Sequence, residues 1–310
     1  MFVNHLVEKR NSVGSEIVGC HSDAMTDIHA AADNLPEYVL RNRASWDDRA
    51  AAHAASPGYQ VKAFIEDPSH LSDVVRFDMP LLGAIDGLRG VHLQCHIGTD
   101  TLSLARLGAQ MTGLDFSAQS LVEARKLAEA TETAIEFVEG DVYAAANLLG
   151  SSAFDFVFTG VGALCWLPSV RQWAQVVSDL LRPGGRLFIR EGHPMLWAID
   201  ETRADDIVVD YAYFETEQPL VDDDPGTYVP TDVKFRENIT MTWNHGIGEI
   251  ITALGDVGMQ ITGLVEHQSV PWEAIPGQMV EGDDGEWRLR ERPERLACTY
   301  TLQAVKAERA

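Results

Sequence analysis

The stretch Val91-His-Leu-Gln-Cys-His-Ile-Gly98 decides how the rest of the chain is interpreted. It predicts a short apolar strand followed by a turn, and helical spacing follows over Thr101–Leu107. Strands that alternate with helices indicate a parallel sheet covered on both faces, and right-handed crossovers make such a sheet doubly wound. The alternation continues with predicted strands at Met111–Leu114, Ile135–Val138, Phe154–Thr159, Arg186–Arg190, Gln260–Glu266 and Ala297–Val305, and with predicted helices that start at Ser117 and cover Arg171–Leu181 and Ile247–Val257.

The flanks of this core differ from it in composition. Residues 1–35 are polar where a signal peptide would be apolar, and we expect a loosely ordered extension. Residues 36–88 predict an amino-terminal helical segment, and residues 89–310 carry the sheet. The alternation lapses over residues 195–243, which are acidic and aromatic. We expect an insertion there that lies over the carboxyl ends of the strands, where open α/β sheets bind their ligands.

The charge balance excludes some partners. There are 47 acidic and 24 basic side chains, for a formal net charge of -23. Such a surface repels phosphate backbones and anionic lipid, so we expect no nucleic-acid or membrane partner. No apolar run approaches the ~20 residues that span a bilayer. The four cysteines lie far apart, which fits a reducing cytoplasm and predicts neither a disulfide framework nor a structural zinc site. A homodimer stays open.

The turn after the first strand limits the choice of cofactor. A dinucleotide site would need G-x-G-x-x-G, because glycines let the backbone approach a pyrophosphate. Only Gly98 is present, and the side chains of Gln94 and His96 would crowd a diphosphate. S-adenosylmethionine has no phosphate, so the same turn counts less against it.

Acidic residues follow the next two strands. Asp115 ends the second strand, where a ribose would lie, and a carboxylate there can accept both ribose hydroxyls. It could instead cap the following helix, for which Ser117 is also a candidate N-cap. Asp141 could accept the adenine amino group while Val142 packs on the ring, or it could be a turn aspartate. The small residues of Thr159-Gly-Val-Gly162 either let a cofactor pass or make a turn.

Taken in order, these motifs resemble a known family. The motifs that carry the resemblance are the run Leu93–Ala109, Leu114-Asp-Phe-Ser117, Gly140-Asp-Val142, Phe154-Asp-Phe156, Thr159-Gly-Val-Gly162 and Leu181-Arg-Pro-Gly-Gly185. Together they resemble class I S-adenosylmethionine-dependent methyltransferases, in particular a bacterial subgroup with an L-Q-C-H-x-G first motif, over roughly residues 38–305. The resemblance implies a Rossmann-like sheet with an antiparallel last strand. The chain departs from the general pattern at His92, which replaces an acidic residue, and at Gln94 and His96, which replace glycines.

The resemblance also implies how the cofactor would be held. The amino-terminal segment would fold over S-adenosylmethionine, and Arg43 would suit the carboxylate of the cofactor through a bidentate fork. These amino-terminal side chains could equally be helix-packing residues. The expected cofactor contacts are Arg43, Trp46, Tyr59, Gln94, Cys95, His96, Gly98, Asp115, Phe116, Ser117, Asp141, Val142, Thr159 and Gly160.

Methyl transfer needs donor and acceptor in line, and a base when the acceptor is a hydroxyl. His193 follows the fifth strand, and His245 and Glu249 are four residues apart, which places them on one helix face if the helix starts early enough. We expect these three residues to be catalytic, although they could also be structural. His245 and Glu249 could ligate a divalent metal together with His193, but no metal site is predicted. The expected acceptor is a small molecule, either the hydroxyl of a sugar or natural product, or an amine.

Two other functions remain open. The same sheet could belong to a non-catalytic cofactor-binding protein, which would keep Asp115 and Asp141. An NAD-dependent oxidoreductase would need the three-glycine turn and a proton-donor motif such as Tyr-x-x-x-Lys, and the sequence has neither.

Overall fold

A seven-stranded sheet forms the centre of the computed structural model, which describes residues 35–203 and 205–308. The strand order is β3-β2-β1-β4-β5-β12-β8, and every neighbouring pair is parallel except those that involve β12. The prediction of a doubly wound, mostly parallel sheet with an antiparallel last strand is confirmed. The strands are β1 Arg89–Leu93, β2 Gln110–Asp115, β3 Glu136–Glu139, β4 Phe154–Thr159, β5 Leu181–Gly192, β8 Met259–His267 and β12 Thr299–Lys306.

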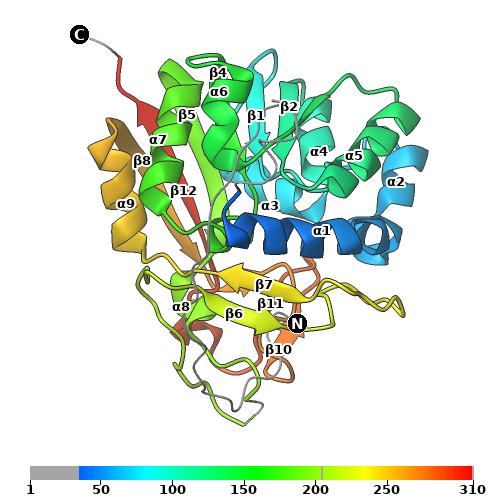
Figure 1. Cartoon of the computed structure of the whole chain (residues 1–310), viewed down its shortest axis with the longest axis vertical. Helices are drawn as coiled ribbons and strands as arrows, with labels where there is room; N and C mark the ends of the chain where they lie inside the picture. The colour runs from blue at the N-terminus through cyan, green and yellow to red at the C-terminus, as the bar shows by residue number, and fades with distance from the viewer. Residues whose placement is uncertain (1–34, 204, 309–310) are drawn as a thin grey trace, which may run out of the picture.

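Helices cover both faces of this sheet (Figure 1). Successive side chains of a strand point to opposite faces, so β4 sends Val157 into one core and Phe156 and Phe158 into the other. One face packs against α6 Ala145–Leu149, α7 Val170–Leu180 and α9 Ile247–Asp256; the other packs against α3 Asp73–Leu82 and α4 Thr99–Arg106, with α5 Ala118–Ala130 beside them.

The amino-terminal helices lead up to the sheet. α1 Glu37–Ala55 ends at Ser56, where Pro57 and Gly58 break the helix, and α2 Val61–Glu66 follows. Figure 1 shows α1 lying across the lower end of the sheet, between the strands and the segment that follows β5. The remaining short 3₁₀ turns are Pro57–Tyr59, Val142–Ala144, Leu164–Trp166 and Pro293–Arg295. Residues 1–34, for which we expect a loose extension, lie outside the described residues.

Two insertions, which we call the first and second excursions, leave the sheet at its carboxyl edge. The first covers residues 193–246, between β5 and α9, and contains α8 Pro194–Trp197 and an antiparallel pair, β6 Leu220–Asp223 and β7 Ile239–Thr242. It lies beneath α1 in Figure 1, on the side away from the strands, and α1 packs against β7. The second excursion lies between β8 and β12, and the sequence analysis did not anticipate its small sheet of β9 Ser269–Val270, β10 Met279–Glu281 and β11 Trp287–Leu289.

Two boundaries matter for the site, and the first of them differs from the prediction. β5 starts at Leu181, because the Arg182-Pro-Gly-Gly185 turn is absorbed into the strand as an irregularity opposite β4. α9 starts at Ile247, so His245 precedes the helix. No helix among the described residues combines the length and the apolar character that a membrane span requires.

Candidate cofactor and acceptor site

The turn after β1 has a left-handed backbone at three residues, two of which are not glycine. Gln94 and His96 have φ values of 58° and 49°, and Gly98 has a φ of 78°. A left-handed non-glycine residue costs of order 1–3 kcal/mol and persists only where its surroundings hold it. Gln94 is held by its amide, whose Nε2 donates to the Ala163 carbonyl at 2.9 Å. The two side chains that replace glycines therefore tie this turn to other parts of the fold.

His96 is one member of a buried chain of polar contacts. Its Nδ1 lies 2.9 Å from the Ser120 hydroxyl and its Nε2 lies 2.9 Å from Nδ1 of His53 in α1. His53 in turn places Nε2 2.7 Å from the Thr227 hydroxyl in the first excursion. Burial lowers the pKa of His53 to about 3 and that of His96 well below its usual range, so both rings are neutral. The chain links α5, the β1 turn, α1 and the excursion.

Asp115 ends β2 as predicted, with only 5% of its surface exposed. One carboxylate oxygen accepts from the backbone N–H of His96 and the other from that of Ser117, both at 2.8 Å. Burial raises the pKa of Asp115 to about 6. The backbone N–H of Phe116 also contributes, and since a carboxylate has about four acceptor sites, it can accept a further donor. Ser117 is the N-cap of α5, as predicted, and accepts from Ser120 N at 3.0 Å.

Asp141 follows β3 and heads a 3₁₀ turn, in which its carboxylate accepts from the backbone N–H of Tyr143 at 2.7 Å. Val142 is buried in the core against α7. Tyr38 at the start of α1 lies close enough that burial together with the Asp141 charge raises its pKa. α1 therefore reaches from Asp141 at one end to the β1 turn at the other.

Two buried polar atoms at this edge have no hydrogen-bond partner among the described residues. They are Oε1 of Gln94, after β1, and the hydroxyl oxygen of Thr159, at the end of β4. Buried polar groups in folded proteins are nearly always paired, so each exception calls for an explanation. β1 and β4 are neighbours, and a polar ligand between their loops would satisfy both atoms.

The loop after β4 is fixed by Glu191, a residue that the sequence analysis did not select. One oxygen of this carboxylate accepts from Gly162 N and Gly192 N, both at 2.6 Å, and the other accepts from Ala163 N and Leu164 N at 2.8 and 2.9 Å. Burial raises the pKa of Glu191, and the four backbone donors oppose that shift. The available signal was an acid at the end of an otherwise apolar strand.

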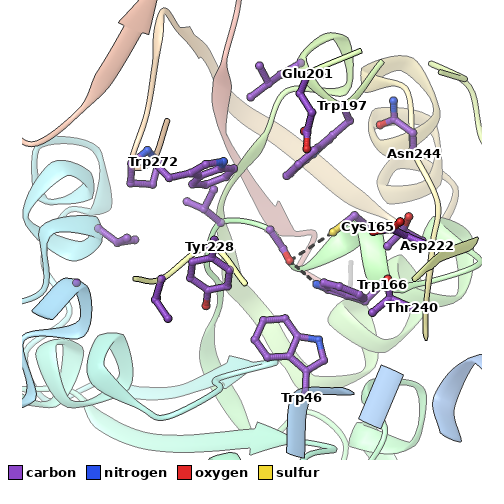
Figure 2. Close-up of a pocket in the computed structure, with 18 of the residues that line it drawn as sticks. Trp46, Cys165, Trp166, Trp197, Glu201, Asp222, Tyr228, Thr240, Asn244 and Trp272 are labelled. Carbon is purple, nitrogen blue, oxygen red and sulfur yellow. Dashed lines mark hydrogen bonds between the residues drawn. The ribbon is translucent and has the colours of Figure 1, made fainter. Parts of the chain in front are cut away.

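A cavity of about 690 Å³ opens beside the β1 and β4 loops. It is bounded by the start of α4, by the β4 loop, by α1 and by both excursions. Figure 2 shows Trp46 and Trp166 on one side of it, Tyr228 and Trp272 on another, and Trp197 with Glu201 beyond them. Aromatic side chains dominate the wall: Trp46, Tyr59, Phe64, Trp166, Trp197, Tyr211, Tyr228, Trp243 and Trp272.

Arg49 fastens the first excursion over this cavity. Its guanidinium donates to the carbonyls of Asp224, Gly226 and Glu237 at 2.6 to 3.2 Å and lies 4.6 Å over the ring of Phe235. The sequence analysis chose Arg43 instead. Arg43 is partly exposed on α1 and makes no hydrogen bond or ion pair with the described residues.

The predicted cofactor contacts divide into three groups. Trp46 and Tyr59 line the cavity. Arg43 does not. The others gather at the carboxyl ends of β1 to β4 but outside the cavity lining: Gln94, Cys95, His96, Gly98, Asp115, Phe116, Ser117, Asp141, Val142, Thr159 and Gly160. Of these, Cys95 is buried against Leu121 and Ala124 of α5.

The predicted catalytic residues are engaged within the fold, and none lines the cavity. His193 caps α8, its Nδ1 accepting from Met195 N at 3.0 Å, and its Nε2 lies 2.9 Å from Glu266. Glu249 caps α9 by accepting from Gly246 N at 2.6 Å. For these two side chains a role in proton transfer stays a prediction.

His245 does not share a helix face with Glu249. A shared face required a helix that includes His245, and α9 begins two residues after it, at the predicted Ile247. Both nitrogens of His245 face oxygen acceptors, with Nδ1 2.8 Å from Glu215 and Nε2 2.8 Å from the Leu167 carbonyl. Both ring nitrogens are therefore engaged within the fold, and a role of His245 in catalysis stays a prediction. Among the described residues, no group of three or more potential ligands lies so as to hold a metal ion.

Known proteins resemble this chain in both sequence and structure. Residues 91–187 match a family model described as "Methyltransferase domain". A solved structure described as a putative S-adenosylmethionine-dependent methyltransferase from Listeria monocytogenes superposes with a TM-score of 0.55 at 18% identity, over 76% of this chain and 97% of that one. The chain has a methyltransferase fold.

Two curated relatives match parts of this methyltransferase fold. Methyltransferase phqN from Penicillium fellutanum is 32% identical over 112 residues, which are 34% of this chain and 32% of that protein. Malonyl-[acyl-carrier protein] O-methyltransferase from Enterobacter lignolyticus is 38% identical over 80 residues, which are 26% of this chain and 29% of that protein. The chain spans about a third of the length of these relatives.

Proposed function

We propose that this chain binds S-adenosylmethionine at the carboxyl ends of β1 to β4 and transfers its methyl group to a small molecule held in the cavity. The observation that carries the proposal is the placement of Asp115. A buried carboxylate that can still accept a further donor ends the second strand of a methyltransferase fold, next to the β1 turn. The matched methyltransferase domain spans the same strands.

The residues present fit this cofactor. Asp115 would accept the ribose hydroxyls, Asp141 would accept the adenine amino group, and the orphaned Gln94 Oε1 and Thr159 hydroxyl would gain polar partners. The cofactor supplies a methyl group that its cationic sulfur already activates. The chain's own contribution is to fix the β1 and β4 loops, through His96 and Glu191, and to exclude water with α1 and the excursions.

The cavity supports a small acceptor. Cofactor and substrate sites of this kind are concave and mostly apolar, with a few convergent polar groups. The aromatic walls come from α1 and from both excursions, so the acceptor would be enclosed rather than presented on a flat surface. A macromolecular acceptor could reach such a cavity only through a protruding group.

Calorimetric titration with S-adenosylhomocysteine and NAD, side by side, tests the cofactor assignment. We expect heat of binding from S-adenosylhomocysteine and none from NAD, since the side chains of Gln94 and His96 occupy the turn that a diphosphate needs. Binding of NAD without S-adenosylhomocysteine would reverse the assignment. Formation of S-adenosylhomocysteine from S-adenosylmethionine on addition of metabolite fractions then separates an enzyme from a non-catalytic binder.

A further inference from the structure

The charged side chains that line the cavity are all acidic. They are Asp73, Asp100, Glu201 and Asp222, and no lysine, arginine or histidine lies among the described lining residues. Aromatic side chains line the cavity together with these acids. A large apolar cavity with charges of one sign selects its occupant by charge.

Two of the four carboxylates already have partners. Asp73 pairs with the Arg76 guanidinium and accepts from Gln60 Nε2 at 2.7 Å. Asp100 accepts from the Ser72 hydroxyl. Arg76 compensates the charge of Asp73, and Asp100 has a side-chain donor in Ser72. Glu201 and Asp222 have neither kind of partner among the described residues, which leaves them as the acids for a ligand.

Asp222 lies on β6 with 7% of its surface exposed, and no described side chain donates a hydrogen bond to its carboxylate. Arg49 is the cation nearby, but its N–H groups are directed to carbonyl oxygens, to Ser45 and to Asn238. The carboxylate accepts from the backbone N–H of Asp223 but forms no salt bridge with the described residues, and a buried carboxylate with so few partners favours either a proton or a cation. Burial accordingly raises the pKa of Asp222.

Glu201 lies on the first excursion and, like Asp222, accepts no hydrogen bond from a described side chain. Burial raises the pKa of Glu201 to about 8, and the charge of Asp222 adds to the shift. Both acids line the cavity. A single cation between them would relieve the burial cost of both charges.

The aromatic walls suit the same cation. Trp197 and Trp272 stack with their ring centroids 5.8 Å apart, and Trp46 meets Trp166 edge-on at 5.3 Å. Figure 2 shows Glu201 next to Trp197, and Asp222 on the same side of the cavity as Trp166. The faces of tryptophan rings attract cations, most strongly where water is excluded. Carboxylates and ring faces together make a site for an ammonium group on an apolar body.

We infer that the methyl acceptor is an amine on an aromatic or other bulky apolar body, bound as the ammonium between Glu201 and Asp222. This inference rests on the proposed function. In the reaction, the ammonium gives one proton to a carboxylate, and the freed nitrogen lone pair forms the bond to the methyl carbon. The carbon–sulfur bond of the donor breaks with its electron pair going to sulfur, and the product is the N-methylated ammonium.

The test compares two probes that share one aromatic body, 2-(1-naphthyl)ethylamine and 2-(1-naphthyl)ethanol. Their affinities are measured by tryptophan fluorescence on the full chain, with S-adenosylhomocysteine at saturation so that the cofactor site is filled. We expect the amine to bind at least 10-fold more tightly than the alcohol. Glu201→Gln and Asp222→Asn should each reduce the preference, and the double variant should remove it while alcohol binding is unchanged.

The control is Asp223→Asn, which removes the same charge from the next residue of β6, on the exposed face of that strand. It should keep the full preference. Melting curves show that each variant is folded, and the unchanged alcohol affinity shows that the cavity is intact.

Four results would overturn the inference: no amine binding at millimolar concentration, equal binding of both probes, an amine preference that survives in the double variant, or amine binding that disappears when S-adenosylhomocysteine is added. The last result would assign the two carboxylates to the cofactor. If S-adenosylhomocysteine binds normally in these experiments, the inference fails alone; if it does not bind at all, the proposed function fails.

Discussion

Replacing Glu191 by glutamine removes the carboxylate that holds the β4 loop without changing the size of the side chain. Each oxygen of Glu191 accepts two backbone N–H groups, and the side chain is 3% exposed. A glutamine offers one oxygen and one NH₂ group. Whichever way the amide is turned, two backbone N–H groups then face another donor.

The cost follows from that geometry. Hydrogen bonds to charged groups contribute roughly 1.5–3 kcal/mol each, so losing two costs about 3–6 kcal/mol. A protein of this kind has a free energy of unfolding of roughly 5–15 kcal/mol. We therefore expect Glu191→Gln to lower Tm by on the order of 10 °C.

Thermal unfolding followed by circular dichroism measures this shift. The matched control is Glu139→Gln, an exposed glutamate at the end of β3, for which no change is expected. A shift below about 2 °C for Glu191→Gln would refute the reasoning, since it would mean that the carboxyl is protonated and that other contacts hold the loop.

Three further predictions concern buried charges. Glu286→Gln leaves the fully buried Arg190 without its ionised partner and should cost about 3–5 kcal/mol in urea unfolding, whereas Asp256→Asn, which breaks the exposed pair with Arg171, should cost under about 1 kcal/mol. Burial raises the pKa of Asp78 to about 8, so its contribution to stability falls as pH rises; from pH 5 to 7, wild type should lose about 1.4 kcal/mol per pH unit relative to Asp78→Asn. Burial lowers the pKa of His92 to about 3, so here the free energy of unfolding falls as pH falls. Between pH 6 and 4, wild type should lose about 1.4 kcal/mol of stability per pH unit relative to His92→Asn. Parallel pH profiles for wild type and either variant would contradict the assigned shift.

The sheet was predictable because its strands are buried on both faces. A central parallel strand is an apolar run between turn residues, and β4 has the predicted bounds, Phe154–Thr159. The excursions lack that signal. The strands β9 to β11 have two or three residues each, which is too short for any periodicity to be visible.

The contacts that build the site were hidden for a different reason. His53 meets His96 across 43 residues, and Arg49 reaches the Glu237 carbonyl across 188. Local pattern carries no information on such pairs. Asp115 was found because its place at the end of a strand is a local feature. The contacts of His245 with Glu215 and the Leu167 carbonyl join residues 30 and 78 positions apart, which no local pattern reveals.

Binding of S-adenosylhomocysteine to wild type and Asp115→Asn, measured by calorimetry, tests the central claim most directly. The substituted amide would keep one acceptor oxygen but lose the charge, so we expect wild type to bind and the variant to bind at least about 10-fold more weakly. The exposed Asp283→Asn variant is the control and should bind as wild type does. Equal affinity of wild type and Asp115→Asn, or no binding to wild type, would contradict the account.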